Sequence, residues 1–171
     1  MDRRLPTKCQ EALAKRDVPL ASNQIAYSLI GRHNGAQETL DACNELGVKV
    51  LASFPSAMGL LTGKYSSGTT GADVLSSSLT TNKKTKLEES DLLGYADGIS
   101  PLLVVMEQIA KRRSKTVAQV ALNYIICKGA IPIPGARTEA QVMDNINAMG
   151  WRLTAEEVSQ LEYASDALGF G

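Results

Sequence analysis

The sequence has no apolar run near the roughly 20 residues that a membrane-spanning helix needs. Its first residues are mixed in charge, with no apolar stretch after them, so they do not resemble a secretory signal and are short for a transit peptide. An excess charge of one sign is also missing, because 18 basic residues balance 18 acidic ones. Without a global field to attract them, neither nucleic acid nor a membrane is expected as a partner. The prediction is a soluble intracellular protein, cytoplasmic or plastid and not secreted.

Cysteine and histidine are scarce, with three of the first and one of the second. The cysteines are far apart and form no CxxC pair, which argues against disulfides and structural zinc and favours a reducing compartment. Cys43 and Cys127 lie in helix-like apolar segments, where a thiol usually packs as a small core residue. His33 stands in a turn-rich stretch without a ligand partner at metal-site spacing. We expect a solvated loop histidine and no metal site.

The glycine-rich motifs that mark common nucleotide folds are absent as well. What recurs instead is a helical stretch, a glycine, a short apolar strand and a polar turn. The pattern predicts strands over residues 18–24, 48–54 and 130–135, each followed by a turn. Three strands cannot close an eight-stranded barrel of roughly 250 residues. We therefore predict an α/β fold that is the C-terminal part of a TIM (β/α)8 barrel.

Helices are predicted between these strands. Hydroxyl residues followed three positions later by Gln or Glu form capping boxes at Thr116, Thr138 and Thr154. We expect one partial domain over residues 1–171, with a long loop at about 66–97. The expected helices cover residues 9–15, 37–46, 101–111, 117–128, 138–149 and a last segment from 154.

In such folds the functional residues lie at the carboxyl ends of the strands. Among the three strand ends predicted here, the segment after the last strand has the most specific pattern of residues. Gly135 and Arg137 precede the start of a helix, and Gln141 and Asn145 follow at spacings of four, on one helix face. A helix start and a planar guanidinium suit a phosphate monoester, and the helix face suits a ribose and an adenine edge. The alternative is that Arg137 is a surface residue and Gln141 only a cap. Spacing alone leaves both open.

Two other strand ends carry weaker signals. Asn23 and Gln24 come at the end of an apolar stretch and can hold a carboxamide by paired hydrogen bonds. Side-chain amides that form their hydrogen bonds within a turn are commoner, however. Phe54 can stack on a ring or fill the core, and base rates favour the core.

Five ordered segments resemble the aldo-keto reductase family. They cover its sixth strand, the stretch after its seventh strand, its seventh helix, its cofactor-phosphate segment and a stretch typical of plant and algal relatives. The match extends over most of residues 10–165 apart from 66–97. In that order, the segments are residues 19–29, 59–65, 115–124, 131–145 and 150–154.

The resemblance implies a barrel that reduces aldehydes or ketones with NADPH. By position, Gln24 contacts the nicotinamide carboxamide, while Gly135, Arg137, Gln141 and Asn145 hold the adenosine-phosphate end. Three further residues stand at cofactor positions. Asp144 takes the place of an acidic residue near the adenine, and Ser53 and Phe54 take the places of a stacking aromatic and a pyrophosphate-binding serine.

The resemblance also implies a gap. The family's Asp, Tyr, Lys and His tetrad lies on its first four strands, whereas Met1 corresponds to the helix before the sixth. Tyr27 and Tyr65 are not the catalytic tyrosine by position, so no catalytic residue is assigned to this chain. We therefore expect this chain to be the NADP(H)-binding half of a reductase and to be inactive by itself. The alternative is a non-catalytic NADP(H)-binding or regulatory module. A small carbonyl compound is the expected substrate, and self-association or complementation by an N-terminal half is expected.

Overall fold

The computed structural model describes residues 5–64 and 98–169. Helices alternate with strands over most of this length, as predicted, while the expected loop at 66–97 lies wholly outside the described residues. A single partial domain over 1–171 therefore stays a prediction. The elements are α1 (Leu5–Ala14), β1 (Ser22–Ala26), α2 (Ala36–Glu45), β2 (Lys49–Ser53), a 3-10 helix (Ala57–Thr62), α5 (Ser100–Arg113), α6 (Val117–Cys127), β3 (Ile131–Pro132), α7 (Glu139–Ile146) and α8 (Ala155–Asp166).

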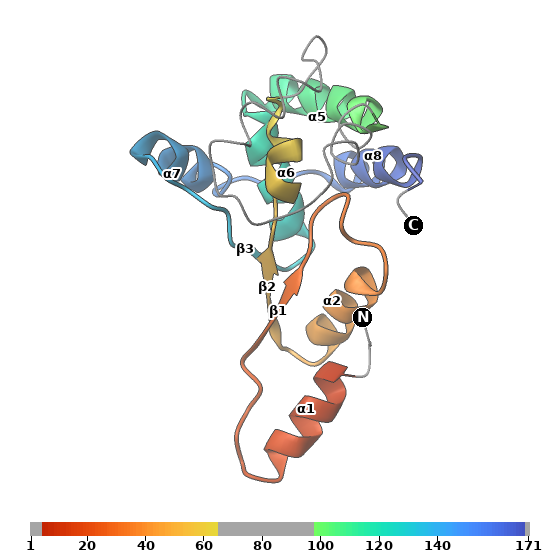
Figure 1. Ribbon diagram of the computed structural model, residues 1–171, viewed down its shortest axis with the longest axis vertical. Helices are drawn as coiled ribbons and strands as arrows, with labels where there is room; N and C mark the ends of the chain where they lie inside the picture. Colours follow the sequence, from red (N-terminus) through yellow and green to blue (C-terminus); the bar gives the residue numbers. More distant parts are fainter. Residues whose placement is uncertain (1–4, 65–97, 170–171) are drawn as a thin grey trace, which may run out of the picture.

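The three strands form one parallel sheet in the order β1-β2-β3. In Figure 1 the sheet lies at the centre of an elongated molecule, with α1 at one end and α5 and α8 at the other. Gln24 pairs with Leu51, and Leu51 pairs with Ile131, so these three residues lie side by side in the register of the sheet. Because the strands are parallel, their carboxyl ends meet at one edge. The predicted α/β arrangement is confirmed.

Helices cover one face of the sheet. Ile25, Val50 and Ala52 point into that layer and are fully buried, where α2 packs on β1 and β2 and α6 packs on β3. The alternate residues point the other way, and there Gln24 and Ile131 are exposed. Parallel sheets are normally covered on both faces. Among residues 5–64 and 98–169, no helix packs on this second face, which we call the open face of the sheet.

The main core lies among α5, α6 and α8, whose apolar faces bury large side chains such as Met106, Ile125 and Leu161. Cys43 is buried as predicted, and Cys127 is partly buried. All three predicted capping boxes are present, at the starts of α6, α7 and α8. None of the helices within the described ranges is long and apolar enough to cross a membrane.

One buried amide organises the connection from α7 to α8. Asn123 of α6 is completely buried; its Nδ2 donates to Ala148 O at 2.8 Å and to Trp151 O at 3.0 Å. Its Oδ1 accepts from Leu153 N–H at 2.9 Å. A single side chain thus satisfies three backbone groups of an irregular segment, which would otherwise be buried without partners.

Some predicted bounds are wrong. The first strand begins at Ser22 rather than 18, because Asp17 adopts a left-handed φ of 58° and Pro19 offers no N–H to a ladder. The third strand keeps only two residues, since its prolines interrupt the pairing. The helix predicted over 138–149 ends at Ile146.

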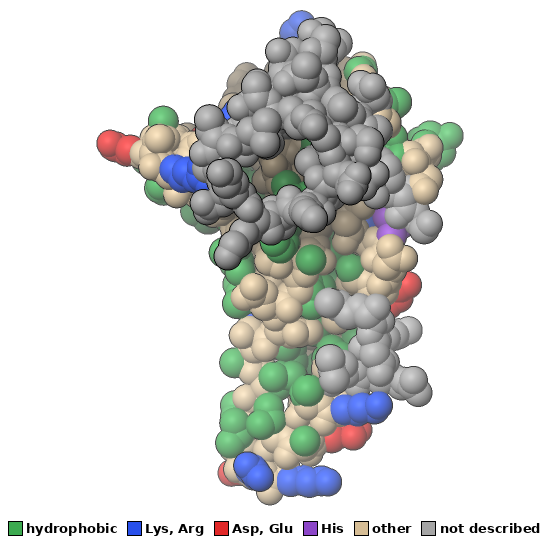
Figure 2. Space-filling view, viewed as in Figure 1, with side chains coloured by type: hydrophobic (Ala, Val, Ile, Leu, Met, Phe, Trp, Pro, Cys, Tyr) green, Lys and Arg blue, Asp and Glu red, His purple; other side chains and the backbone are tan. Residues whose placement is uncertain are grey.

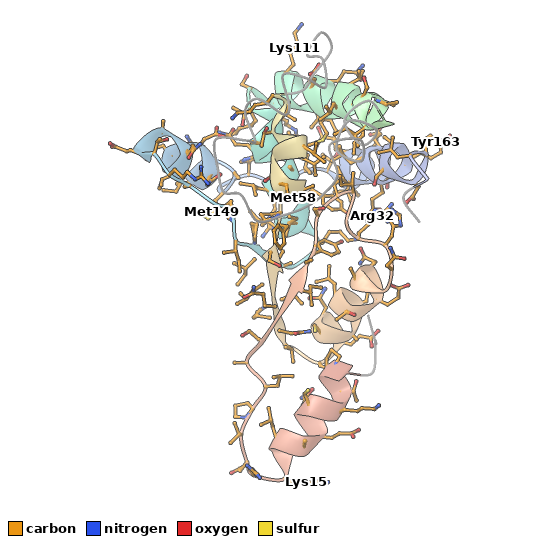
Figure 3. All side chains as sticks on the ribbon, viewed as in Figure 1. Lys15, Arg32, Met58, Lys111, Met149 and Tyr163 are labelled. Carbon is orange, nitrogen blue, oxygen red and sulfur yellow. The ribbon has the colours of Figure 1, made fainter. Side chains whose placement is uncertain are left out.

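His33 also differs from its prediction. Its side chain is only 21% exposed and lies 3.8 Å from Asp166 Oδ1, because the end of α8 packs against the loop after β1. Arg32 forms an ion pair with the same carboxylate and donates to Glu162 O at 3.2 Å. Figure 3 shows Arg32 beside α8. The loop histidine is therefore half-buried rather than solvated.

Candidate functional site

The three predicted clusters lie on or directly after three adjacent strands, and Gln24 stands within β1 rather than at its end, because the strand continues to Ala26. Ser53 ends β2 opposite Ala26 of β1, and Ala52 pairs with Pro132 of β3. The segment of residues 134–138 leaves β3 at the same edge and leads into α7. No hydrogen bond within the described ranges joins this segment to Gln24 or Ser53. The sheet alone sets their arrangement.

The loop between β3 and α7 is fixed by one side chain. Gln141 Oε1 accepts the N–H groups of Arg137 at 2.7 Å and of Thr138 at 3.3 Å. In return, Thr138 Oγ1 accepts from Gln141 N–H at 3.3 Å. Gln141 is therefore a cap, as the alternative interpretation held, and only its Nε2 is left to meet a ligand.

Arg137 is exposed at this corner, and its guanidinium forms no hydrogen bond or ion pair to any described residue. The start of α7 supplies the positive end of a helix dipole, but Glu139 in the first turn offsets part of it. The five donors of the guanidinium are thus the main feature here that can recognise an anion. A phosphate monoester fits this geometry.

The two residues further along α7 have different surroundings. Asn145 Nδ2 lies 3.5 Å from Gly135 O, a long contact that leaves the amide able to turn to a ligand. Asp144 is engaged, because its Oδ1 accepts from Gln119 Nε2 at 2.6 Å and from Thr116 Oγ1 at 3.2 Å. Its carboxylate ties α7 to the start of α6, a role that the sequence did not indicate.

On the β1 and β2 side, Gln24 is exposed on the open face of the sheet. Ser53 is half-buried, and its Oγ donates to Ile25 O at 3.0 Å. Phe54 was expected in the core, and this is wrong: the side chain is 63% exposed. Its backbone turns left-handed at φ 54° as the chain leaves β2, which swings the ring out of the helix layer.

Phe54 begins a strained stretch that the sequence did not reveal. Ala57 and Met58 also have positive φ, of 48° and 57°, although neither is glycine. Each such residue costs about 1–2 kcal/mol, so the turns persist only because buried neighbours hold them. Leu60 and Leu61 supply that anchorage. Figure 3 shows Met58 beyond the end of β2.

Tyr27 belongs to a buried network outside this edge. Its hydroxyl donates to Gln37 Oε1 at 2.6 Å, while the hydroxyl of Tyr124 donates to Glu162 Oε1 at 2.9 Å. Lys128 Nζ bonds the same carboxylate at 3.0 Å. Burial raises the pKa of Tyr27 to about 12 and raises that of Tyr124 as well. The partners come from distant parts of the chain, so no local pattern predicts this network. Its bonds link elements of the fold.

Comparison with known proteins identifies relatives. The sequence pattern of the Aldo/keto reductase family matches residues 6–166. The chloroplastic pyridoxal reductase of Arabidopsis thaliana is 41% identical over 158 residues, which are 92% of this chain and 40% of that protein. The L-glyceraldehyde 3-phosphate reductase of Escherichia coli K12 is 25% identical over 91% of this chain and 44% of its own length.

Solved structures show the same architecture. The glycerol dehydrogenase of Gluconobacter oxydans superposes with a TM-score of 0.67 at 26% identity, covering 94% of this chain and 47% of its own. A thermostable aldo-keto reductase in complex with the inhibitor epalrestat gives a TM-score of 0.62 at 21% identity, covering 96% of this chain and 46% of its own. The chain therefore has the fold of part of a TIM barrel, and it spans less than half the length of these relatives.

Proposed function

The chain belongs to the aldo/keto reductase family, and on that premise we propose that it forms the cofactor-binding half of an NADPH-dependent oxidoreductase acting on aldehyde or ketone groups. The observation that carries this is the exposed guanidinium of Arg137, held at the carboxyl end of β3 by the Gln141 cap. The names of two relatives, pyridoxal reductase and glyceraldehyde 3-phosphate reductase, denote reduction of an aldehyde and support the substrate class.

In this proposal each site residue has a defined task. Arg137 binds the 2′-phosphate through its planar donors, and the free Nε2 of Gln141 and the amide of Asn145 bind the adenosine beside it. Gly135 lets the backbone approach the phosphate, and Asp144 holds α7 in place. Bound NADPH supplies the hydride.

The nicotinamide end is assigned to the first two strands. Gln24 pairs with the carboxamide on the open face of the sheet. Ser53 and the exposed ring of Phe54 line the same edge. The acid–base residues come from the part of the relatives that this chain does not match. We place the protein inside the cell, in the cytoplasm or a plastid, and the chloroplastic Arabidopsis relative supports this.

The test compares coenzymes. This chain is joined to the unmatched part of the Arabidopsis pyridoxal reductase, and NADPH and NADH binding is followed by fluorescence. Arg137→Ala removes charge-assisted hydrogen bonds worth about 1.5–3 kcal/mol, so NADPH binding should weaken roughly 10- to 100-fold while NADH binding changes little. Lys111→Ala on α5 is the control, because it removes an equal charge far from the site (Figure 3). Equal loss for both coenzymes would remove Arg137 from phosphate recognition.

A second candidate is a non-catalytic NADP(H)-binding or regulatory module. It is favoured by the capped loop before α7, which is formed within this chain alone. Calorimetry of the unmodified chain against NADPH and NADH decides between the two. Micromolar binding with preference for NADPH supports the module, whereas absence of binding until the rest of the barrel is supplied supports the first proposal.

A further inference from the structure

The start of α6 is joined to α7 by the side chains of its own capping box. Gln119 is buried, and its Oε1 accepts the N–H of Thr116 at 3.1 Å, which closes the box. The Nε2 of the same amide donates to two acceptors on α7, the backbone O of Asp144 at 3.2 Å and its Oδ1 at 2.6 Å. Thr116 Oγ1 donates to the same carboxylate at 3.2 Å. Both N–H groups of the Gln119 amide therefore bind a single residue of α7.

These polar bonds fix a helix that has no buried face of its own. Within residues 5–64 and 98–169, α7 packs chiefly on α6 and buries none of its side chains, and Val142, Met143 and Ile146 are exposed. Figure 1 shows α7 projecting to one side of the molecule, and hydrophobic side chains are visible on this projection in Figure 2. A helix normally takes its stability from packing an apolar face. The orientation of α7 in this chain depends instead on its polar contacts with α6.

The three capping boxes of the chain use their last residue in different ways. In α8, Glu157 closes the box and also binds Arg113 of α5 at 2.7 and 3.0 Å, so this box joins two helices. In α7, Gln141 closes the box and its Nε2 has no bond to a described residue. Gln119 is similar to Glu157, because its side chain caps its own helix and also holds a neighbouring one. The start of α6 thus sets the position of α7.

We infer that Gln119 is a positioning residue of the coenzyme site, an inference that rests on the proposed function. It acts through Asp144, which lies beside Asn145 in the sequence and one turn after Gln141. A rotation of α7 at this contact moves both residues that we assign to the adenosine. A binding group has to be held within about 0.5 Å of its place, so the Gln119 amide controls how well they bind. The guanidinium of Arg137 is left chemically unchanged.

The first experiment follows hydrogen exchange in the full chain without coenzyme. Gln119→Ala removes the donors that face α7, so the amides of α7 should exchange roughly tenfold faster while those of α5 keep their rate. Gln160→Ala is the matched control, because this exposed amide of α8 bonds Glu156 one turn away, at 3.4 Å. Asp144→Ala removes the same contact from the other side and serves if Gln119→Ala does not fold. The double variant should exchange no faster than Asp144→Ala, since both changes remove one interaction.

A second experiment separates positioning from general stability. Gln119→Glu still accepts the N–H of Thr116 but turns a carboxylate toward Asp144, so α7 should detach at about pH 8. At about pH 5, a proton shared by the two carboxyl groups restores a donor, and α7 should dock again. Trp151, the only tryptophan of the chain, reports this by fluorescence, because its Nε1 donates to Asn147 O just after α7 at 3.1 Å. The parent and Gln119→Ala should show no such recovery, and its absence in Gln119→Glu overturns the inference.

The last measurement uses the joined protein of the coenzyme test. Gln119→Ala should weaken NADPH and NADH binding alike, by roughly tenfold, because both coenzymes contain the adenosine that α7 contacts. Gln160→Ala should bind both coenzymes like the parent. Unchanged exchange of α7, or unchanged coenzyme binding by Gln119→Ala, overturns the positioning role alone. A parent protein that binds neither coenzyme refutes the proposed function and the positioning role together, and only this outcome removes both.

Discussion

Replacing Asn123 should destabilise the chain more than its size suggests. Asn123→Leu keeps the branched shape and the number of side-chain heavy atoms but leaves Ala148 O, Trp151 O and Leu153 N–H without their partner. At about 1 kcal/mol for each buried group, the free energy of unfolding should fall by about 3 kcal/mol. The three groups lie in the connection that follows α7, so the variant also loosens the helix that carries Gln141 and Asn145.

Urea unfolding followed by far-ultraviolet circular dichroism measures this loss. With a slope of about 2 kcal/mol/M, the midpoint should fall by about 1.5 M. Asn44→Ala is the matched control, because it removes a single exposed bond to Lys128 O at 3.2 Å and should cost less than about 1 kcal/mol. A Leu variant as stable as the control would refute the argument that one buried amide satisfies the α7–α8 connection.

Three further predictions concern pH and glycine. Arg113 lowers the pKa of Glu157, so Arg113→Met should be less stable than the parent at neutral pH, and urea midpoints should converge as the pH falls below the ordinary carboxyl value of 4.5. Burial raises the pKa of Tyr27 to about 12. The stability that its neutral hydroxyl contributes to the fold is therefore complete below pH 10 and is lost as the pH rises through 12. Tyr27→Phe should therefore lose less stability than the parent over that alkaline range in the same assay. Gly63→Ala should lower the free energy of unfolding by more than the roughly 1 kcal/mol expected for Gly47→Ala. Both glycines have positive φ, but only at Gly63 would the added Cβ lie 3.1 Å from a valine side chain on α6. Equal thermal midpoints for the two glycine variants would contradict this.

The sequence was most informative where short-range chemistry decides the structure. The boxes at Thr116, Thr138 and Thr154 each need only residues three apart, and all three form as predicted. The parallel sheet was predictable for a similar reason, since apolar runs after glycines are local patterns. The length of β3 was not, because its prolines remove ladder bonds without changing the apolar pattern.

The site was harder to predict in its details. Phe54 looks like a core residue by type, and only the left-handed backbone after β2 exposes it. Asp144 lies near the expected phosphate residues, yet its partners on α6 are 25 and 28 residues away in sequence, and they decide where its carboxylate points. Spacing on a helix face indicates which residues can share a site, and contacts with other elements determine which of them are free.

The bonds that fasten α8 to the loop after β1 have a consequence for biosynthesis. Arg32 bonds Glu162 O, and Ser165 Oγ bonds Leu29 O, across separations of 130 and 136 residues. At roughly 5–20 residues per second, a ribosome takes on the order of 10 s to make the intervening chain. During that time the first strand and its loop are without these partners. The loop after β1 should then be open to chaperones until α8 has been made.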